Sequence, residues 1–147
     1  MPDLAPVVIA SDHAGYRLKL ELVRALEQWG YSVEDLGTHD EASTDYPDFA
    51  HDLCAAVVDG RYSHGVLVCG TGLGMSMAAN RHAGVRAAVC TDSYAARMTR
   101  NHNDANVLCL GSRIVGPGVA EDILKTFLES EFEGGRHARR VGKIETP

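Results

Sequence analysis

Residues able to bind an anion and to move a proton gather at a few points in the sequence, each at the end of an apolar run or directly after one. These segments are Ser11-Asp12-His13, Cys69 to Gly74, Thr91-Asp92-Ser93 and Gly111-Ser112-Arg113. In open parallel sheets, ligands bind beyond the carboxyl ends of the strands, because helix N-termini and loop amides converge there. If the apolar runs are parallel strands, the four segments share one edge of the sheet, and we expect the functional site at that edge.

The segment Cys69-Gly-Thr-Gly-Leu-Gly74 joins a thiol to a glycine-rich turn that opens a predicted helix. Glycines at 70, 72 and 74 allow backbone N–H groups to turn inward around an anion, either a phosphate or an enediolate. A thiol at a helix N-terminus is favoured as the thiolate, which acts as a base or a nucleophile. The spacing differs from GxGxxG, and no GxxxxGK[ST] is present, which argues against a dinucleotide site and excludes a P-loop. The alternative is a tight strand-to-helix turn without a ligand.

Two histidines have a functional and a structural interpretation. Asp12 can simply cap a helix and leave His13 on the surface, but the first and third strands of such folds are usually neighbours, so both residues would share an edge with Cys69. His102 lies where a predicted helix ends, and a histidine there often only complements the helix dipole. A helix end points away from the strand carboxyl ends, so His102 belongs either to a site shared between subunits or to no site.

A small basic cluster follows near the end of the chain. Arg136 and Arg140 are four residues apart and share a helical face, and two guanidinium groups together suit a phosphate. The alternative is a solvated tail. Four basic residues over eight positions are too few for a nucleic-acid track.

The elements that position these residues alternate along the chain. Continuous apolar runs predict strands buried on both faces, at Pro6–Ala10, Tyr31–Leu36, Gly65–Cys69, Val85–Cys90 and Asn106–Leu110. The second run is more polar and predicts an edge strand. Helical stripes lie between the runs: one ends at Gly30, one begins at Pro47, one is capped by Ser93, and one with Val119 begins at Pro117. This alternation predicts an α/β domain with a parallel sheet, and one domain over 1–147 with an arm at about 133–147.

Composition excludes several classes of protein. Fourteen Lys and Arg against twenty Asp and Glu give a net charge of −6, which argues against a nucleic-acid or acidic-membrane surface. No apolar run approaches the roughly 18 residues of a membrane span, and four cysteines without a CxxC pair or signal peptide indicate the cytoplasm. No His, Cys and carboxylate set has metal-ligand spacing. Other residues are expected outside any site: His39, His51, His64 and His82 at the surface or in loops, and Met75, Met77 and Met98 in the core.

Taken in order, the motifs resemble the type B ribose-5-phosphate isomerases, a family that includes the galactose-6-phosphate isomerase subunits. The matching segments run from about residue 7 to 144: Ser11-Asp12-His13-Ala14-Gly15, Thr44-Asp45-Tyr46-Pro47, Cys69 to Gly74, Ala78-Ala79-Asn80, His102-Asn103-Asp104, Gly111-Ser112-Arg113, and Glu133 to His137 with Arg140. The resemblance implies a Rossmann-like α/β/α sandwich with a five-stranded parallel sheet, and a homodimer, sometimes paired into a tetramer, whose active sites are shared between subunits.

The resemblance also implies the reaction and the roles of residues. Ribose 5-phosphate and ribulose 5-phosphate of the pentose phosphate pathway would interconvert through an enediolate, without metal or cofactor. Cys69 would be the base, Thr71 and the loop amides would stabilise the enediolate, and His102 with Asp12 would open the sugar ring. His13, Arg113, Arg136 and Arg140 would hold the phosphate, and Asn103 a sugar hydroxyl. The remaining substrate contacts are expected from Tyr46, Gly70, Gly72, Leu73 and Gly74.

Two alternatives remain open from the sequence. The same isomerisation can act on allose 6-phosphate, galactose 6-phosphate or a tetrulose phosphate, because the distance from Cys69 to the arginines sets the length of the substrate. A sugar-phosphate-binding module without catalysis would need the loop and the arginines but not Cys69 or His102.

Overall fold

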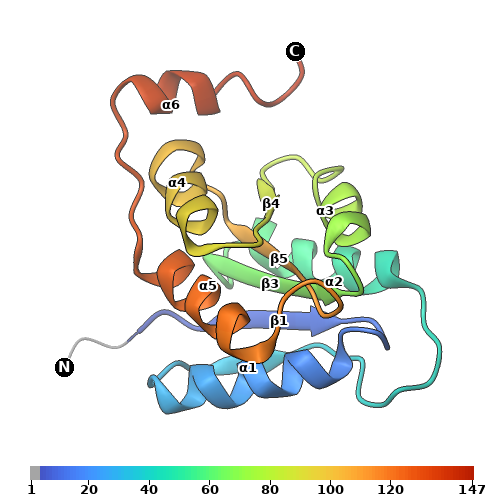
Figure 1. The fold of residues 1–147 in the computed structure, drawn as a ribbon. Helices are drawn as coiled ribbons and strands as arrows, with labels where there is room; N and C mark the ends of the chain where they lie inside the picture. The colour runs from blue at the N-terminus through green and yellow to red at the C-terminus, as the bar shows by residue number, and fades with distance from the viewer. Residues whose placement is uncertain (1–3) are drawn as a thin grey trace.

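Residues 4–147, which the structure describes, form five parallel strands in the order β2-β1-β3-β5-β4, with helices on both faces of the sheet in this computed structural model (Figure 1). The elements in chain order are β1 (Val7–Ser11), α1 (Tyr16–Gln28), β2 (Val33–Asp35), α2 (Tyr46–Val58), β3 (His64–Cys69), α3 (Leu73–Ala79), β4 (Ala87–Val89), α4 (Ser93–Asn103), β5 (Val107–Gly111), α5 (Pro117–Glu129) and α6 (Arg136–Val141). The predicted α/β/α sandwich is confirmed, and β2 is an edge strand as expected.

Two apolar layers hold the helices to the sheet. On one face, α1, α4 and α5 pack through residues such as Leu22 and Ile123. On the other face, α2 and α3 pack through residues such as Leu53 and Met75. The central strands β1, β3 and β5 are buried along nearly their whole length and contribute alternate side chains to each layer. Burial on both faces explains why these strands appear in the sequence as continuous apolar runs.

The structure corrects four expectations about single residues. Asp92, rather than Ser93, caps α4, because its Oδ1 accepts a hydrogen bond from the Ala95 N–H at 2.8 Å. Val119 on α5 and Met77 on α3 are exposed instead of facing the core. His64 lies at the start of β3 rather than in a surface loop, with its ring edge-on to a core phenylalanine. Burial, and to a smaller extent a neighbouring arginine, lowers the pKa of His64 to about 4.

A buried lysine ties the first helix to the loop after β2. Lys19 is fully buried, and its Nζ lies 2.6 Å from Asp35 Oδ1 and donates to the carbonyl of Thr38. The same loop is fastened to the end of β1, since Thr38 N–H donates to the Ser11 carbonyl at 2.8 Å and Ser11 N–H to the Gly37 carbonyl at 2.7 Å. Lys19 therefore fixes the path of the chain just beyond the carboxyl end of β1.

The C-terminal segment forms a short helix that stands away from the sheet. Helix α6 packs against α4 and projects from the body of the molecule (Figure 1). The predicted arm is therefore helical over Arg136–Val141. Within the described residues, no helix is long and apolar enough to cross a membrane.

Replacement of Lys19 tests the importance of this buried ion pair. Lys19→Ala should lower the free energy of unfolding by about 3 kcal/mol, because it leaves the Asp35 carboxylate and the Thr38 carbonyl without their partner. The exposed Lys143→Ala is the matched control and should change stability by less than about 0.5 kcal/mol. Urea denaturation measures both. Equal stability of the two variants would contradict the role assigned to Lys19.

Candidate active site

The carboxyl ends of three neighbouring strands meet at one edge of the sheet. Strand β3 pairs with β1 and β5, with Val68 opposite Ser11 and Cys69 opposite Gly111. Three of the four predicted segments therefore lie together. They enclose a cavity of about 240 Å³ lined by Asp12, His13, Ala14, Tyr46, Cys69, Gly70, Thr71, Gly74 and Arg113. We call this the Cys69 cavity. The fourth predicted segment, Thr91-Asp92-Ser93, follows the edge strand β4 and does not line this cavity.

The glycine loop packs so closely on β5 that side chains are excluded. A Cβ added to Gly111 would lie 2.6 Å from the backbone carbon of Thr71, and Gly72 has a φ of +80°. The N–H of Gly72 donates to Cys69 Sγ at 3.2 Å, and the N–H of Leu73 donates to Thr71 Oγ1 at 3.3 Å. The amides of Gly72 and Leu73 are thus bound by side chains of the loop itself. Neither residue lines the Cys69 cavity, although the sequence analysis expects both to contact substrate.

Asp12 and His13 are fixed by different partners. Asp12 Oδ1 accepts a hydrogen bond from the Gly15 N–H at 3.0 Å, so Asp12 does stabilise the turn into α1. The backbone N–H of His13 donates to Thr44 Oγ1, and the N–H of Thr44 donates to His13 Nδ1, both at 3.1 Å. Because a backbone N–H only donates, Nδ1 is the acceptor, and the neutral ring carries its proton on Nε2. Nε2 is then a donor for an anion in the Cys69 cavity.

Arg113 is held over the glycine loop by the backbone. Its N–H donates to the Gly70 carbonyl at 3.0 Å, and the Ser112 N–H donates to the Cys69 carbonyl at 2.9 Å. A Cβ added to Gly70 would lie 3.2 Å from Arg113 Nη1, so the guanidinium rests against this glycine. The Cys69 cavity therefore contains a thiol, a carboxyl, an imidazole and a guanidinium group.

The other predicted residues line a separate cavity. His102, Asn103 and Arg140 lie around a hollow of about 320 Å³ between the end of α4 and α6, together with His137, Val141 and Ile144. This second cavity shares no lining residue with the Cys69 cavity. Arg136 begins α6 but does not line the hollow. The predicted residues therefore form two groups, one in each cavity, and a single chain does not bring the two groups into contact.

Sequence reasoning missed two residues of this arrangement. His137 is buried and stacks on His102, with ring centroids 4.3 Å apart, but the sequence analysis names it only as the end of the Glu133 to His137 segment. Burial, and to a smaller extent the neighbouring His102 and Arg136, lowers the pKa of His137. Thr44 lies 31 positions from His13 in the sequence, so the sequence gives no sign that the two residues are in contact. Its place in the Thr44-Asp45-Tyr46-Pro47 motif is the one signal that could have found it.

The four cysteines differ in chemical environment. Burial raises the pKa of Cys54 and of Cys90 to about 11 and that of Cys109 well above its ordinary value. These three thiols stay protonated at neutral pH and cannot act as bases. Cys69 alone among the cysteines lines the cavity that holds Asp12 and Arg113.

Comparison with known proteins agrees with this arrangement of strands and loops. A sequence model of the ribose/galactose isomerase family matches residues 7–144. Ribose-5-phosphate isomerase B of Escherichia coli is 46% identical over 138 residues, 94% of this chain and 93% of that protein. D-erythrulose-4-phosphate isomerase of Pectobacterium atrosepticum is 41% identical over 140 residues, 94% of this chain and 91% of that protein. The solved structure of Clostridium thermocellum ribose-5-phosphate isomerase B has a TM-score of 0.93 at 56% identity, covering 95% of this chain and 94% of that one.

The environments of the cysteines predict selective alkylation. Iodoacetamide should modify Cys69 at least about tenfold faster than the other cysteines of the folded protein, because Cys69 lines a cavity, whereas burial raises the pKa of the other three thiols. Mass spectrometry of the digested protein measures modification at each position. The same reaction in urea is the control and should modify all four. Equal rates at Cys54 and Cys69 in the folded protein would contradict this assignment.

Proposed function

The chain belongs to the ribose/galactose isomerase family, and from this premise we propose that it interconverts ribose 5-phosphate and ribulose 5-phosphate. The observation that carries the proposal is Cys69 at the end of β3, in one cavity with Asp12, His13 and Arg113. Aldose–ketose isomerisation needs a base, a donor to a developing oxyanion and an anchor for the phosphate. In this proposal Cys69 supplies the base, Thr71 and the loop amides supply the donors, and His13 with Arg113 supplies part of the phosphate anchor.

Cys69 is the proposed base for the proton transfer. As a thiolate it removes the proton from C2 of the open-chain aldose. The electron pair of that C–H bond forms the C1=C2 bond, while the π pair of the C1 carbonyl moves onto the C1 oxygen to give the enediolate. The same proton returns to C1, and the proton of the C2 hydroxyl passes to the C1 oxygen, which gives the ketose. Thr71 and the remaining loop amides, those of Gly70 and Gly74 among them, stabilise the oxyanion between these steps.

Residues at the end of α4 and on α6 carry the other proposed roles, together with residues of the Cys69 cavity. His102 acts as the acid that opens the sugar ring, with Asp12 on the opposite side, and Asn103 binds a sugar hydroxyl. Arg136 and Arg140 hold the phosphate together with His13 and Arg113, because guanidinium groups bind phosphate oxygens in pairs.

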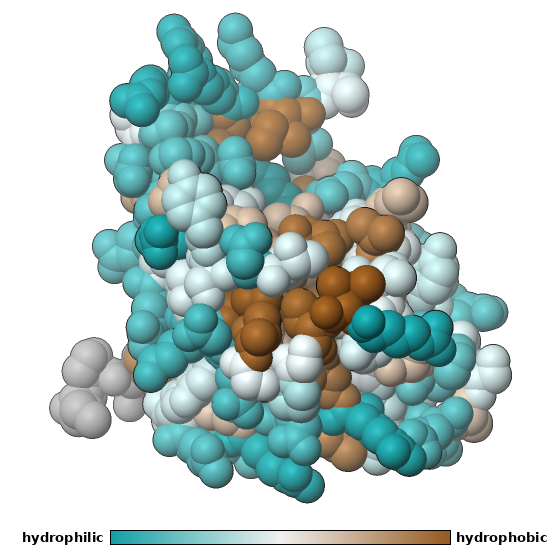
Figure 2. Space-filling model, in the orientation of Figure 1, coloured by the Kyte–Doolittle hydropathy of each residue, from teal (hydrophilic) through white to brown (hydrophobic). Residues whose placement is uncertain are grey.

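We propose that a second copy of the chain joins the two cavities. The Cys69 cavity is smaller than the roughly 300–1,000 Å³ of common ligand sites, and His102 belongs to a different cavity of the same chain. Helix α6, with Arg136 and Arg140, projects beyond α4 (Figure 1). Hydrophobic side chains also gather in the middle of the face that Figure 2 shows, over α3 and the loop after β5. Leu73 and Met77 on α3 and Ile114 in that loop are exposed. A homodimer would bury such hydrophobic side chains, and their exposure in the single chain supports the proposed shared site.

A second candidate is the same isomerisation on another sugar phosphate. Allose 6-phosphate, galactose 6-phosphate and tetrulose phosphates present the same reacting carbons with a phosphate at a different distance. The similarity to a D-erythrulose-4-phosphate isomerase favours testing the four-carbon substrate. A sugar-phosphate-binding module without catalysis differs from both, since it needs no base at Cys69.

Turnover in the presence of excess EDTA tests the proposal. The purified, reduced protein should form ribulose 5-phosphate, and Cys69→Ala should lose about 10²–10⁴-fold in kcat while still binding sugar phosphate, because the base is removed and the anion site remains. Cys54→Ala is the matched control and should retain activity. Full turnover by Cys69→Ala would contradict the base. Activity only on four- or six-carbon phosphates would favour the second candidate instead.

A further inference from the structure

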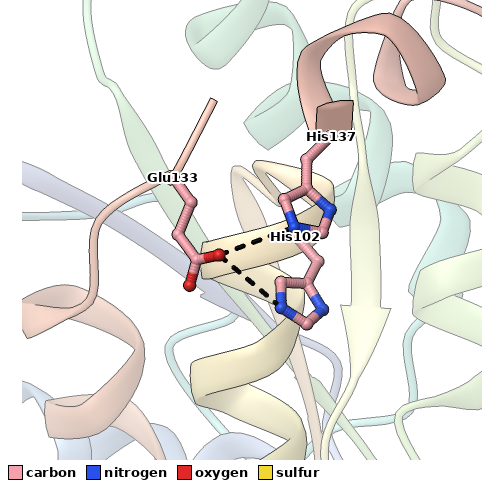
Figure 3. A group of neighbouring side chains, drawn as sticks. All are labelled: His102, Glu133 and His137. Carbon is pink, nitrogen blue, oxygen red and sulfur yellow. Dashed lines mark ion pairs between the residues drawn. The ribbon is translucent and has the colours of Figure 1, made fainter. Parts of the chain in front are cut away.

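Three metal-ligating side chains lie together beside the end of α4, outside the Cys69 cavity. His102, Glu133 and His137 each offer a donor atom, and these atoms lie within 4.8 Å of one another (Figure 3). The carboxylate of Glu133 faces both imidazole rings. The sequence spacing gave no sign of this group, because His102 is 31 positions from Glu133.

A glycine turn brings Glu133 and His137 to the same side of the chain. The N–H of Glu133 donates to the Asn101 carbonyl at 3.0 Å, which fixes Glu133 next to the last turn of α4. Gly134 and Gly135 follow with φ values of +68° and +58°, a conformation that side chains disfavour. The chain then bends into α6, where the N–H of His137 donates to the Gly134 carbonyl at 3.1 Å.

The buried imidazole has an unsatisfied nitrogen. His137 is 8% exposed, and its Nε2 has no hydrogen-bond partner in the described structure. This nitrogen lies 3.5 Å from Glu133 Oε1, which in turn lies 3.9 Å from His102 Nε2. A buried polar atom without a hydrogen bond is unfavourable, so this nitrogen is available to a ligand placed between it and the Glu133 carboxylate.

We propose that His102, Glu133 and His137 form a binding site for a zinc-type divalent cation. Two imidazole nitrogens and one carboxylate oxygen are a set that Zn²⁺ accepts with a fourth position left open, whereas Mg²⁺ and Ca²⁺ prefer oxygen ligands. Zinc bonds of about 2.0–2.1 Å in tetrahedral geometry separate the ligand atoms by about 3.3 Å. The Glu133–His137 distance is near this value. The ring of His102 stacks on that of His137 with an interplanar angle of 7°, so it has to turn out of this stack for both nitrogens to point at one ion. The side chain of His102 is 40% exposed, which leaves room for this rotation.

The surrounding charges make this binding weaker than that of a structural zinc site. Arg136 and Arg140 act electrostatically on His137, and both repel a cation, while Glu133 attracts it. The site therefore takes up and releases zinc with the free concentration of the ion. A bound cation coordinates His102 Nε2 and removes that nitrogen from proton transfer. Inhibition of the isomerase follows, and this consequence, unlike binding itself, rests on the proposed role of His102.

Calorimetry with Zn²⁺ on the metal-free, reduced protein tests the site. The unmodified chain should bind one Zn²⁺, and Glu133→Gln, at a half-exposed position, should weaken binding at least about tenfold because one ligand is lost. His51→Ala is the matched control. It disrupts the other imidazole pair, in which His51 Nδ1 lies 2.7 Å from His82 Nε2, and should leave the affinity unchanged. Unchanged affinity in Glu133→Gln, or loss of binding in His51→Ala or Cys69→Ala, would overturn the proposal.

Activity measured with added Zn²⁺ tests the consequence separately. Zinc should lower the turnover of the unmodified enzyme, EDTA should restore it, and Glu133→Gln should resist inhibition at the same zinc concentration. If calorimetry detects the site but turnover is insensitive to zinc, inhibition is refuted and the metal site stands. If no sugar phosphate is turned over, the proposed function fails, and calorimetry still decides the metal site.

Discussion

The pairing of β3 with β1 on one side and β5 on the other is the interaction on which the Cys69 cavity depends. It sets Cys69 opposite Gly111 and Val68 opposite Ser11, so that three loops meet at one edge. The loops then approach to distances that exclude side chains. A Cβ on Gly15 would lie 2.4 Å from the Val68 carbonyl oxygen, and one on Gly111 would contact Thr71. Backbone contacts of this kind leave little freedom to the thiol and guanidinium groups that the loops carry, which is what a site for proton transfer requires.

Beyond this edge, the chemistry is divided between two parts of the chain. The proposed base lies at the end of β3, and the proposed acid lies at the far end of α4, in a cavity with no common residue. The proposed phosphate ligands are divided in the same way, with Arg113 in the Cys69 cavity and Arg140 on α6. Helix α4 runs opposite to the strand before it, which separates His102 from Cys69, and α6 packs against α4, which separates Arg140 from Arg113. This arrangement also puts His102, the proposed acid, beside Glu133 and His137, the other residues of the proposed metal site.

Much of the fold and half of the site were predictable from the sequence, and the reasons are physical. Strands such as Gly65–Cys69 are buried on both faces, so their apolar runs are continuous, and the glycines after Cys69 mark the turn. Long-range polar contacts leave no such trace. Lys19 on α1 looks like a surface residue until its partner Asp35, at the end of β2, is known. Thr44 contacts His13 only because of the path of a loop. His137 was missed because the bend at Gly134 and Gly135 depends on packing against α4, which has no local signal.

The central claim is that two chains complete each active site, and mixing two inactive variants tests it most directly. Cys69→Ala lacks the proposed base, and His102→Ala lacks the proposed acid. After subunit exchange in equal amounts, half of the dimers contain one chain of each kind, and one of their two sites has both groups intact. Turnover should therefore return to about a quarter of the unmodified rate, as two-fold symmetry requires. No recovery, with mixed dimers verified by native mass spectrometry, would contradict the shared site.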